Sequence, residues 1–393
     1  MGPHHAVPEN PTLNFEQDLQ LLEHLDQLGF SEAWIGEHHS GGFEIIASPE
    51  LFVAMAAART KYIRLGTGVM SLPYHNPLMA AGRIVQLDHM TRGRFMVGIG
   101  PGSRPSDALM MGIDPAVQRD RMAEGIDVLL RLLRGESVTE KTEWYQLNEA
   151  RLQLAPYSVP YPEIAVTSAF TPSGARVAGK HDLGMLCVIA TMAGPGFDSL
   201  GTNWQIANDI AAEQGRTMDP RRLRILIRAH LAETRELARQ QIRHGFEKWL
   251  AYSQNSDATR MNVPAGEDPV EWFAAESGYA VIGTPDDAIA QIEKIQKRFP
   301  DVGCILLSAT DWANYDDRRH SYELYAKYVI PRFEQGIIAR QQSYGWVGEH
   351  GEQLGEERRA AARAMFAKHE AEMAARGKAV TDKPAEGEEI TFN

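Results

Sequence analysis

Cysteine is scarce in this sequence. Only two of the 393 residues are cysteines, and each lies in an apolar run, Cys187 in "GMLCVI" and Cys304 in "VGCILL". A disulfide framework or a thiolate zinc site needs several cysteines at suitable spacing. We therefore expect both cysteines to be small core side chains.

The sequence also lacks an excess of positive charge and any apolar run long enough to span a membrane. Its formal net charge is −12 and its pI about 5.6, which argues against nucleic acid or an anionic membrane as principal partner. We find no secretory signal. With 44% hydrophobic and 23% charged residues, the composition predicts a soluble globular protein. A reducing cytoplasm is the expected location.

What the sequence does contain is an alternation of short β-rich runs with helical patterns. Several of the runs are apolar almost throughout, which is typical of a parallel sheet covered on both faces. The order predicts an α/β fold. The predicted strands are 32–37, 63–69, 94–100, 163–168, 183–189, 223–232 and 302–308, and the predicted helices include 14–28, 49–60, 77–90, 116–134 and 284–298.

Seven predicted strands are one fewer than a (β/α)8 barrel requires. The helix at 14–28 precedes the first of them, so the first strand of a barrel would have to lie around "MGPHHAVPENPTL". Two alternatives follow. Either the fold is a barrel whose first strand is largely missing from this chain, with Met1 and Gly2 as its remnant, or it is an open sheet.

Three regions interrupt the alternation. Residues 139–156 alternate polar and apolar side chains, which predicts a hairpin. Residues 233–280 form a long insertion near the seventh strand, and insertions of this length are usually lids, substrate walls or interfaces. From residue 336 the sequence becomes a charged, Ala-rich helix and a polar tail. We therefore expect a barrel domain over 1–335 and a helical arm and tail over 336–393. The arm either packs on a second copy of the chain or is a solvated appendage.

The segment "EAWIGEHHSGGFE" places an acid and two imidazoles, Glu37, His38 and His39, at the end of a predicted strand. In a parallel barrel, functional side chains gather at this end of the strands. An imidazole there can transfer a proton near neutral pH, and a neighbouring carboxylate can fix its tautomer. Adjacent histidines on an extended segment point to opposite sides, which disfavours a shared metal. General acid/base and purely structural roles both remain open.

Glycines mark the ends of the next two predicted strands. Gly68 follows Thr67, and Gly98 and Gly100 follow in the next strand, so the backbone can approach a flat ligand closely. The dinucleotide fingerprint requires G-x-G-x-x-G at the start of a helix. Here the loop 103–105 contains proline and looks like a poor start for a helix. We predict a backbone wall against a ring system or substrate rather than a dinucleotide site.

A third candidate follows the strand at 163–168. Ser168 ends this strand, and Thr171, Ser173 and Gly174 begin a helix. Free backbone N–H groups, the helix dipole and the hydroxyls would suit a single phosphate monoester. An ordinary Ser/Thr helix cap is the alternative.

Five segments taken together resemble the luciferase-like flavin-dependent monooxygenases, and within them the limonene 1,2-monooxygenase-type branch. They are "GFSEAWIGEHH", "RLGTGVMSLPYHNP", "QLDHMTRGRFMVGIGPGS", "TSAFTPSGARVAGKHDLG" and "VIGTPDDAIAQI". The resemblance implies a TIM-like (β/α)8 barrel that binds reduced FMN at the C-terminal ends of its strands. A separate reductase, using NAD(P)H, would supply the flavin, so NAD(P)H would act only indirectly.

The same resemblance implies roles for individual residues. His38 would be the general acid/base near the reactive flavin carbon, supported by His39 and Glu37. Related enzymes often carry a non-proline cis peptide where Thr67, Gly68 and Val69 stand, beside the isoalloxazine. Ser173 matches the position that holds the FMN phosphate, with Ser168, Thr171 and Gly174 around it. Gly100 stands where luciferase has a cysteine, and Arg104 lies near the position of its phosphate arginine. Tyr74 and His75 would touch substrate or flavin, or serve the loop structurally.

The implied reaction consumes reduced FMN and O2. A flavin C4a-hydroperoxide would pass one oxygen atom to a small apolar organic substrate, and the other would leave as water. Two alternatives are an F420-dependent hydride-transfer oxidoreductase and a non-catalytic flavin-binding barrel. We expect a diffusing flavin reductase and a second copy of the chain as partners, and no resident metal, nucleic acid or membrane.

Overall fold

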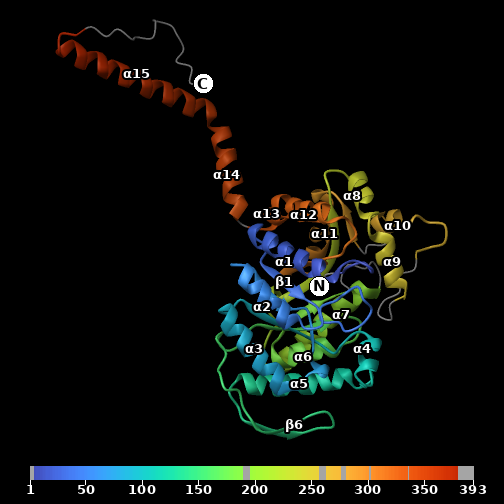
Figure 1. Ribbon diagram of the computed structural model, residues 1–393. Coiled ribbons are helices and arrows are strands. Elements are labelled where there is room, and N and C mark those ends of the chain that lie inside the picture. Colours follow the sequence, from blue (N-terminus) through green and yellow to red (C-terminus); the bar gives the residue numbers. More distant parts are fainter. Residues whose placement is uncertain are drawn as a thin grey trace. The chain divides into compact units, whose positions relative to one another are not determined.

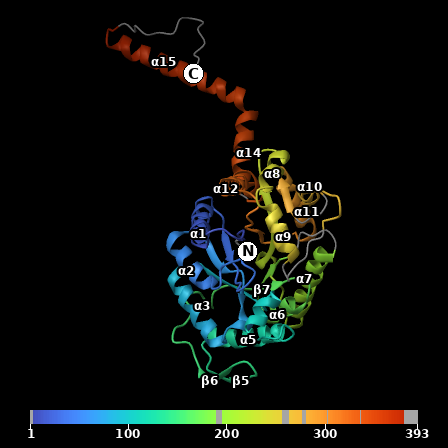
Figure 2. The same ribbon diagram turned by 45° about the vertical axis from the view of Figure 1, so that its right-hand side comes forward.

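Parallel strands lie at the centre of the computed structural model, with helices around them (Figures 1 and 2). The chain divides into two compact units, residues 1–329 and 330–393. The expected domain boundary lies a few residues further on, at 335/336. The residues that the structure describes are 4–188, 195–255, 263–275, 280–300, 302–334 and 336–378.

The sheet of the first unit contains all seven predicted strands. Neighbouring strands are parallel throughout, and Trp34 lies opposite Gly66 where the first two strands pair. In spatial order the strands are β1 (Glu32–Ile35), β2 (Arg64–Thr67), β4 (Phe95–Gly100), β7 (Ile164–Ser168), β8 (Gly184–Cys187), β9 (Leu223–Leu231) and β11 (Cys304–Leu307). Two short strands extend neighbours, β3 (Met70–Ser71) beside β4 and β10 (Ala280–Gly283) beside β9. The parallel α/β fold predicted from the sequence is confirmed.

Helices connect the strands and cover the outside of the sheet. In Figure 2, α1, α2 and α3 follow one side of the strands, and α6 and α7 follow the other. Their bounds are α1 (Pro11–Gln27), α2 (Pro49–Arg59), α3 (Pro77–Thr91), α4 (Pro105–Met110), α5 (Gln118–Leu133), α6 (Ser173–His181), α7 (Pro195–Glu213), α11 (Pro285–Arg298) and α12 (Tyr315–Leu324). Single helical turns lie at Leu72–Tyr74, Pro220–Arg222 and Tyr325–Val329.

Proline stands in the first turn of several of these helices, where its missing N–H costs nothing. The prediction that the loop 103–105 is a poor helix start was wrong, because α4 begins at Pro105 with Arg104 as its N-cap. At α11, Thr284 and Asp287 form a reciprocal capping box.

The gap between β11 and β1 is where the eighth strand of a barrel would lie. Here His4 forms a parallel bridge with Thr310, next to β11. On the other side, the N–H of His5 donates to the carbonyl oxygen of Phe43, 2.7 Å away in the segment after β1. This part of the chain therefore joins the two ends of the sheet at the rim, as the first strand of a (β/α)8 barrel does. The predicted remnant at Met1 and Gly2 lies outside the described residues.

The predicted hairpin and insertion are both present. The hairpin pairs β5 (Val138–Lys141) with β6 (Gln146–Ala150), and its Trp144 indole donates to Glu124 of α5. The insertion contains α8 (Arg235–Ile242), α9 (Phe246–Asn255) and α10 (Pro269–Ala275), packed around Phe246, Phe273 and Trp312. Residues 256–262 and 276–279 of the insertion lie outside the described residues.

The second unit consists of α13 (Ile330–Phe333), α14 (Gly336–Glu349) and α15 (Gly351–Ala375). The structure describes α14 and α15 in full, and neither contains a buried side chain.

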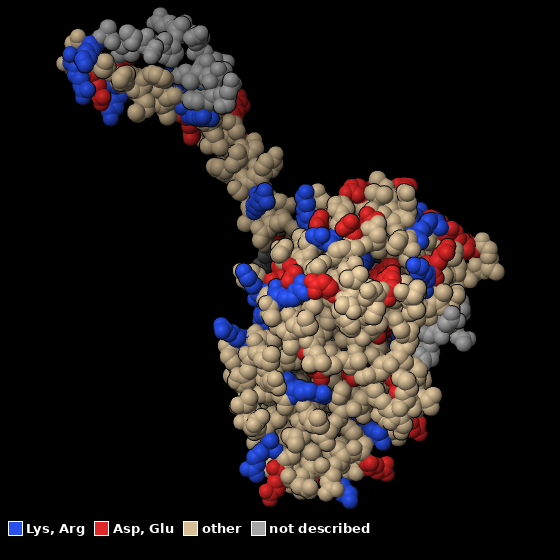
Figure 3. All heavy atoms as spheres, in the orientation of Figure 1, with Lys and Arg blue, Asp and Glu red and all other residues tan. Residues whose placement is uncertain are grey.

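Among the described residues, no helix has the length and apolar character needed to cross a bilayer. Acidic and basic side chains are interspersed on the face that Figure 3 shows.

The two thiols lie on sheet strands, as predicted. Cys187 is buried on β8 and Cys304 is partly buried on β11, and both are free. Burial raises the pKa of each thiol to about 12, so neither forms a thiolate readily.

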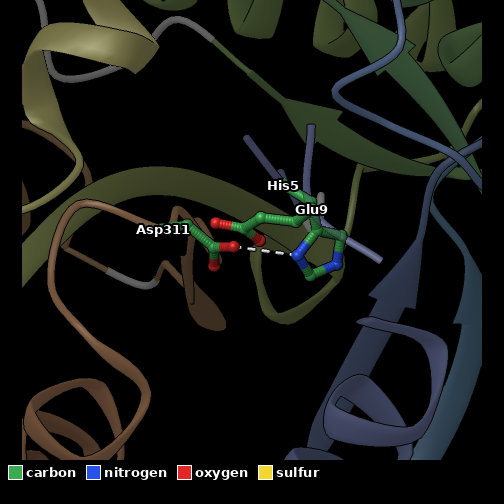
Figure 4. A group of neighbouring side chains, drawn as sticks. All are labelled: His5, Glu9 and Asp311. Carbon is green, nitrogen blue, oxygen red and sulfur yellow. Dashed lines mark hydrogen bonds and ion pairs between the residues drawn. The ribbon is translucent and has the colours of Figure 1, made fainter. Parts of the chain in front are cut away.

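His5 fixes the amino-terminal segment to the first unit (Figure 4). The imidazole is 1% exposed. Its Nε2 lies 2.8 Å from a carboxylate oxygen of Asp18, and its Nδ1 lies 2.8 Å from one of Asp311. Arg318 pairs with the second oxygen of Asp311. Burial alone would lower the pKa of His5, but the bonds to Asp18 and Asp311 outweigh it and raise that pKa to about 9. At neutral pH His5 is therefore an imidazolium between two carboxylates.

This arrangement predicts a loss of stability at alkaline pH. Because the pKa of His5 is raised on folding, its contribution is fully present below pH 6.5 and is lost as the pH rises through about 9. The free energy of unfolding should fall across this window by at most about 1.4 kcal/mol per pH unit from this group. Urea unfolding at several pH values measures it. His5→Gln should remove this part of the slope, whereas the exposed His369→Gln should keep it; equal slopes in both variants would contradict the assignment.

Candidate functional site

The C-terminal ends of β1, β2, β4 and β7 meet at one rim of the sheet. A methyl group at Gly36 would lie 3.5 Å from the carbonyl oxygen of Gly68 and 3.9 Å from the ring of His38. A methyl group at Gly100 would lie 2.5 Å from Val69 and 3.1 Å from the Thr167 hydroxyl. The three candidate segments of the sequence therefore come together at this rim.

The segment after β2 has the backbone that the resemblance implies, since the peptide bond between Gly68 and Val69 is cis. The Thr67 hydroxyl donates to the carbonyl oxygen of Gly98 and accepts from its N–H, so this side chain is occupied by the neighbouring strand. A methyl group on Gly68 would lie 2.7 Å from the Cβ of Trp34. We expected the glycines to admit a ligand; at Gly68 and Gly100 the missing side chain also lets the strands themselves approach.

Glu37 is the central acceptor at this rim. Its side chain is fully buried. One carboxylate oxygen lies 3.0 Å from Nε2 of His39 and 2.9 Å from Nε2 of His75, and the other accepts the N–H of Ser71 at 2.6 Å. Burial alone would raise the pKa of Glu37, but the bonds from His75 and His39 outweigh it and lower the pKa. The carboxylate therefore stays ionised and holds the proton of each ring on Nε2.

We expected the neighbouring carboxylate of Glu37 to fix the tautomer of His38, but the partners of His38 come from other segments. Its Nδ1 accepts from Nε of Arg104 at 3.0 Å and lies 3.7 Å from Asp107, while its Nε2 lies 3.3 Å from Glu44. Burial would lower the pKa of His38, but the bonds to Asp107 and Glu44 outweigh it and raise that pKa to about 9. Arg104 can donate to Nδ1 only while that nitrogen is unprotonated, so Arg104 and Asp107 compete there.

The carboxylate of Glu44 connects His38 to the insertion. It accepts from Nη2 of Arg104 at 2.6 Å and from the Tyr252 hydroxyl of α9 at 3.3 Å. The Tyr252 ring stacks on Phe43 with ring centres 4.2 Å apart, and Arg104 lies over it. Arg104 is only 4% exposed, and its guanidinium donates hydrogen bonds to His38 and Glu44. The predicted lid region thus contacts the segment that carries the histidines.

The start of α6 offers hydroxyls to the same rim. Thr171 is exposed, and its hydroxyl lies 3.0 Å from that of Ser173. The N-cap is Pro172, and neither hydroxyl caps the helix, so the alternative of an ordinary Ser/Thr helix cap was wrong. Gly174 is required because a Cβ there would collide with the carbonyl oxygen of Thr167. Ser168 is buried and accepts from the Asn203 amide at 3.0 Å, so Thr171 and Ser173 are the accessible hydroxyls.

The two proposed substrate residues differ in their contacts. His75 uses both ring nitrogens within the protein, Nε2 toward Glu37 and Nδ1 toward Arg83 at 3.0 Å. These bonds favour the structural role for His75. Tyr74 is partly buried, its hydroxyl accepts from Gln118 at 3.1 Å, and its ring lies edge-on to His39.

Among the described residues, one further group of side chains has the composition of a metal site: His5, Glu9 and Asp311 (Figure 4). Their donor atoms lie within 4.8 Å of one another. Both nitrogens of His5 are already bonded to carboxylates, and Arg318 pairs with Asp311. These contacts identify the group as an ion-pair network that holds the amino-terminal segment.

Sequence reasoning missed the partners of His38. Glu44 stands six residues after His38, at the end of "EAWIGEHHSGGFE", but a turn containing two glycines separates them. Asp107 lies in α4, the helix that follows the loop 103–105, where we did not expect a helix to start. Tyr252 comes from the insertion, where a single sequence carries no signal for a contact with Glu44.

Comparison with known proteins identifies the family of this chain. The profile of the family "Luciferase-like monooxygenase" matches residues 2–301. Limonene 1,2-monooxygenase of Rhodococcus erythropolis is 44% identical over 88% of this chain and 88% of its own length. 4-Hydroxyprotoasukamycin monooxygenase of Streptomyces nodosus subsp. asukaensis is 42% identical over 89% of this chain and 95% of its own.

A solved structure shows the same fold. It is a type II Baeyer-Villiger monooxygenase, the oxygenating constituent of 3,6-diketocamphane monooxygenase from Pseudomonas putida in complex with FMN. It superimposes with a TM-score of 0.71 and 23% identity over 84% of this chain and 96% of its own. The profile match and the two relatives establish the family: this chain belongs to the luciferase-like monooxygenases.

Proposed function

We propose that this protein is the oxygenase of a two-component system, which uses reduced FMN and O2 to insert one oxygen atom into a small apolar organic substrate. One observation carries the proposal: the ring of His38, a histidine with a raised pKa, and the carbonyl oxygen of Gly68 both lie within 4 Å of the place that a methyl group at Gly36 would take, on the same rim as the hydroxyls that begin α6. Family membership and the FMN complex of a protein with the same fold support it.

The residues at the rim fit FMN by their chemistry. The hydroxyls of Thr171 and Ser173 and the N-terminal N–H groups of α6 are hydrogen-bond donors for a phosphate monoester. The first turn of this helix carries no acidic residue, and its Arg176 is exposed. Val69 and the backbone of Gly68 and Gly100 would lie against the flavin ring. When bound, reduced FMN supplies the reaction with O2.

The protein's own residues would donate a proton and keep water out of the site. His38 holds a proton on Nε2 toward Glu44, and its raised pKa keeps it able to act as a general acid at neutral pH. Glu37 and His39 would keep the neighbouring segment in place. A site that excludes water protects reactive intermediates from hydrolysis. Helices α8 and α9, anchored at the rim by Tyr252, would be the wall that does so and selects an apolar substrate.

The proposal includes two protein partners. A separate reductase would use NAD(P)H and release reduced FMN by diffusion. A second copy of this chain would cover the arm formed by α14 and α15, because the apolar side chains of Ile338, Tyr344 and Trp346 are exposed to solvent in the single chain.

A direct test supplies photoreduced FMN, isotope-labelled O2 and a panel of terpenes and cyclic ketones. We expect a product that carries one labelled oxygen atom, detected by mass spectrometry. Without substrate the same mixture should yield hydrogen peroxide. Tight binding of F420, with hydride transfer and no labelled product, would favour the deazaflavin alternative. Flavin binding with no product from any substrate and no dependence on His38 would favour the non-catalytic barrel.

His38→Asn should lower product formation by roughly 10²- to 10⁴-fold, the usual contribution of a general acid. FMN affinity, measured by fluorescence quenching, should stay within about threefold, because the phosphate and ring contacts come from other residues. The control is His89→Asn, an exposed histidine on α3, which should keep full activity. Equal activity of His38→Asn and the control would contradict the assigned role.

The pH dependence of product formation tests the environment of His38. Since an acid must be protonated to act, the rate should fall as the pH rises through about 9. Glu44 is one of the groups that raise this pKa, so Glu44→Gln should move the fall to lower pH. The exposed Glu247→Gln on α9 should leave the profile unchanged. A profile that does not move in Glu44→Gln would show that another group controls the rate.

The phosphate contacts predict a difference between two flavins. Thr171→Val and Ser173→Ala should each weaken FMN binding roughly tenfold, since each removes a hydrogen bond to a charged group. Riboflavin lacks the phosphate, so its affinity should be the same in the variants and the parent protein. A parallel loss for both flavins would mean that the hydroxyls serve the local fold instead.

A further inference from the structure

His4 is a partly buried histidine that the proposed reaction does not yet use. It lies where the amino-terminal segment bridges Thr310, and its ring is edge-on to that of Tyr252 on α9. Its Nε2 lies 3.5 Å from Oε1 of Glu44. The same oxygen atom lies 3.3 Å from Nε2 of His38. One carboxylate oxygen therefore stands between two imidazoles, and one of these imidazoles is the general acid of the proposed function.

The second ring nitrogen of His4 fixes its tautomer. Nδ1 lies 3.2 Å from the carbonyl oxygen of Ala309, at the end of β11. A carbonyl oxygen can only accept a hydrogen bond, so Nδ1 carries the hydrogen atom of the neutral ring. The lone pair of Nε2 then faces Glu44. A proton that His4 takes up is therefore bound at Nε2, next to the carboxylate that His4 shares with His38.

Burial and four neighbouring groups decide how tightly His4 holds such a proton. Burial has the largest effect and lowers the pKa of His4, and the charges of Arg228 on β9 and of His38 lower it further. Glu44 and the carbonyl oxygen of Ala309 raise this pKa, but by less, so it lies below the ordinary value of 6.5. The pKa of His38 is about 9. Transfer of a proton from His4 to His38 is therefore favourable.

His38 must regain each proton that it gives up. In the proposed function it donates a proton from Nε2 to the reacting oxygen atom, and its remaining hydrogen atom then lies on Nδ1 toward Asp107. About one fifth of the His38 side chain, 18%, is exposed. Bound flavin and substrate at the rim would cover this part and keep water from the ring. While the site is covered, the proton has to return through the protein.

We propose that His4 is a proton-relay residue, which returns a proton from water to His38 through Glu44. The proton passes from water to Nε2 of His4, then to Oε1 of Glu44, and from this oxygen to Nε2 of His38. Only a proton moves; no electrons are transferred, and no bond between heavy atoms forms or breaks. His4 acts through Glu44 and His38 and is not itself a catalytic residue. The inference rests on the proposed function.

Glu44 holds the proton only during the transfer. Burial alone would raise the pKa of this carboxyl group, but His4 and His38 outweigh burial and lower the pKa. The carboxylate is therefore ionised before and after the proton passes. The side chain of His4 is 15% exposed, and the residues that follow it, 7–10, are exposed. Water can therefore reach the relay from the amino-terminal segment.

A rival route would enter at Nδ1 of His38 through Asp107. The Asp107 carboxylate lies 3.7 Å from that nitrogen, and its side chain is 2% exposed. It also accepts hydrogen bonds from the backbone N–H of His39 and from the Ser40 hydroxyl. Neither of these donors titrates near neutral pH, whereas the next group beyond Glu44 is an imidazole that does. The contacts therefore favour entry through His4.

The exchange of a ring hydrogen of His38 with water tests the relay. The protein is labelled with ¹⁵N-histidine, saturated with oxidised FMN and studied by NMR at pH 7. The Nε2 hydrogen of His38 should exchange roughly 10²-fold more slowly in His4→Gln than in the parent protein, since a positioned proton carrier contributes at least that much. Glutamine keeps a donor for Ala309 but cannot carry a proton. The matched control is His89→Gln on α3, which should exchange at the parent rate.

The same measurement without FMN shows whether covering matters. The parent protein and His4→Gln should then exchange alike, because water reaches the exposed part of His38 directly. Equal exchange rates in the two FMN complexes would overturn the relay. A slower exchange in Asp107→Asn but not in His4→Gln would place the entry at Nδ1 and would also overturn it. The titration of the parent protein needs no variant: His4 should titrate at lower pH than His38, and the reverse order would contradict the proposed direction.

Product formation separates a relay from a structural role. His4→Gln should lower the rate of product formation while FMN affinity stays at the parent value. In a Glu44→Gln background His4→Gln should cause no further loss, because the route is already broken, whereas independent losses would add. Additive losses would therefore overturn the relay. A parent protein that forms no product would overturn the proposed function and the relay with it, whereas an active parent and an equally active His4→Gln would overturn the relay alone.

Discussion

The site depends on the hydrogen bonds that the ionised carboxylate of Glu37 accepts. It stands just beyond β1, and its partners come from the segments around Ser71 and His75 as well as from His39. Burying an ionised carboxylate without these donors would cost much folding free energy. Removing one donor would leave part of the buried carboxylate without a hydrogen bond. Because one anion joins the ends of two strands, the spacing between β1 and β3 is set by side-chain chemistry and not only by sheet hydrogen bonds.

Glu37 also separates the roles of three histidines. His39 and His75 both donate to it, which leaves them little freedom to exchange protons. His38 lies outside this network and faces Glu44, Asp107 and Arg104 instead. Burial and the Arg104 guanidinium both lower the pKa of this imidazole, but the two carboxylates outweigh them and raise it, and Nδ1 has two competing partners. The imidazole that we propose as the general acid is thus the one whose partners do not include Glu37.

The sequence predicted the strands well because a parallel sheet covered by helices leaves an apolar run at each strand, and such runs stand out. It also placed Glu37, Gly68, Gly100 and Ser173 on one rim, since strand ends meet there in any parallel barrel. It did not predict which carboxylate binds which histidine. The turn at 40–43 returns Glu44 to His38, and α9 brings Tyr252 to Glu44; both contacts join segments that no local pattern relates. The helix at Pro105 was missed because proline was read as a breaker, although it suits a first turn.

The strand that carries these residues is an unusual place for a precise site. β1 pairs with β2 along one edge, and its other edge borders a cavity that residues of α1, α2 and β11 also line. What holds its upper end is a set of bonds beyond the sheet: Glu37 to Ser71, the Phe43 carbonyl to His5, and Glu44 to Arg104. His5 is in turn held by Asp18 and Asp311. An edge strand anchored in this way can keep its tip fixed while its lower part, among the described residues, pairs with a strand on one side, because the bonds that orient His38 all lie at the tip.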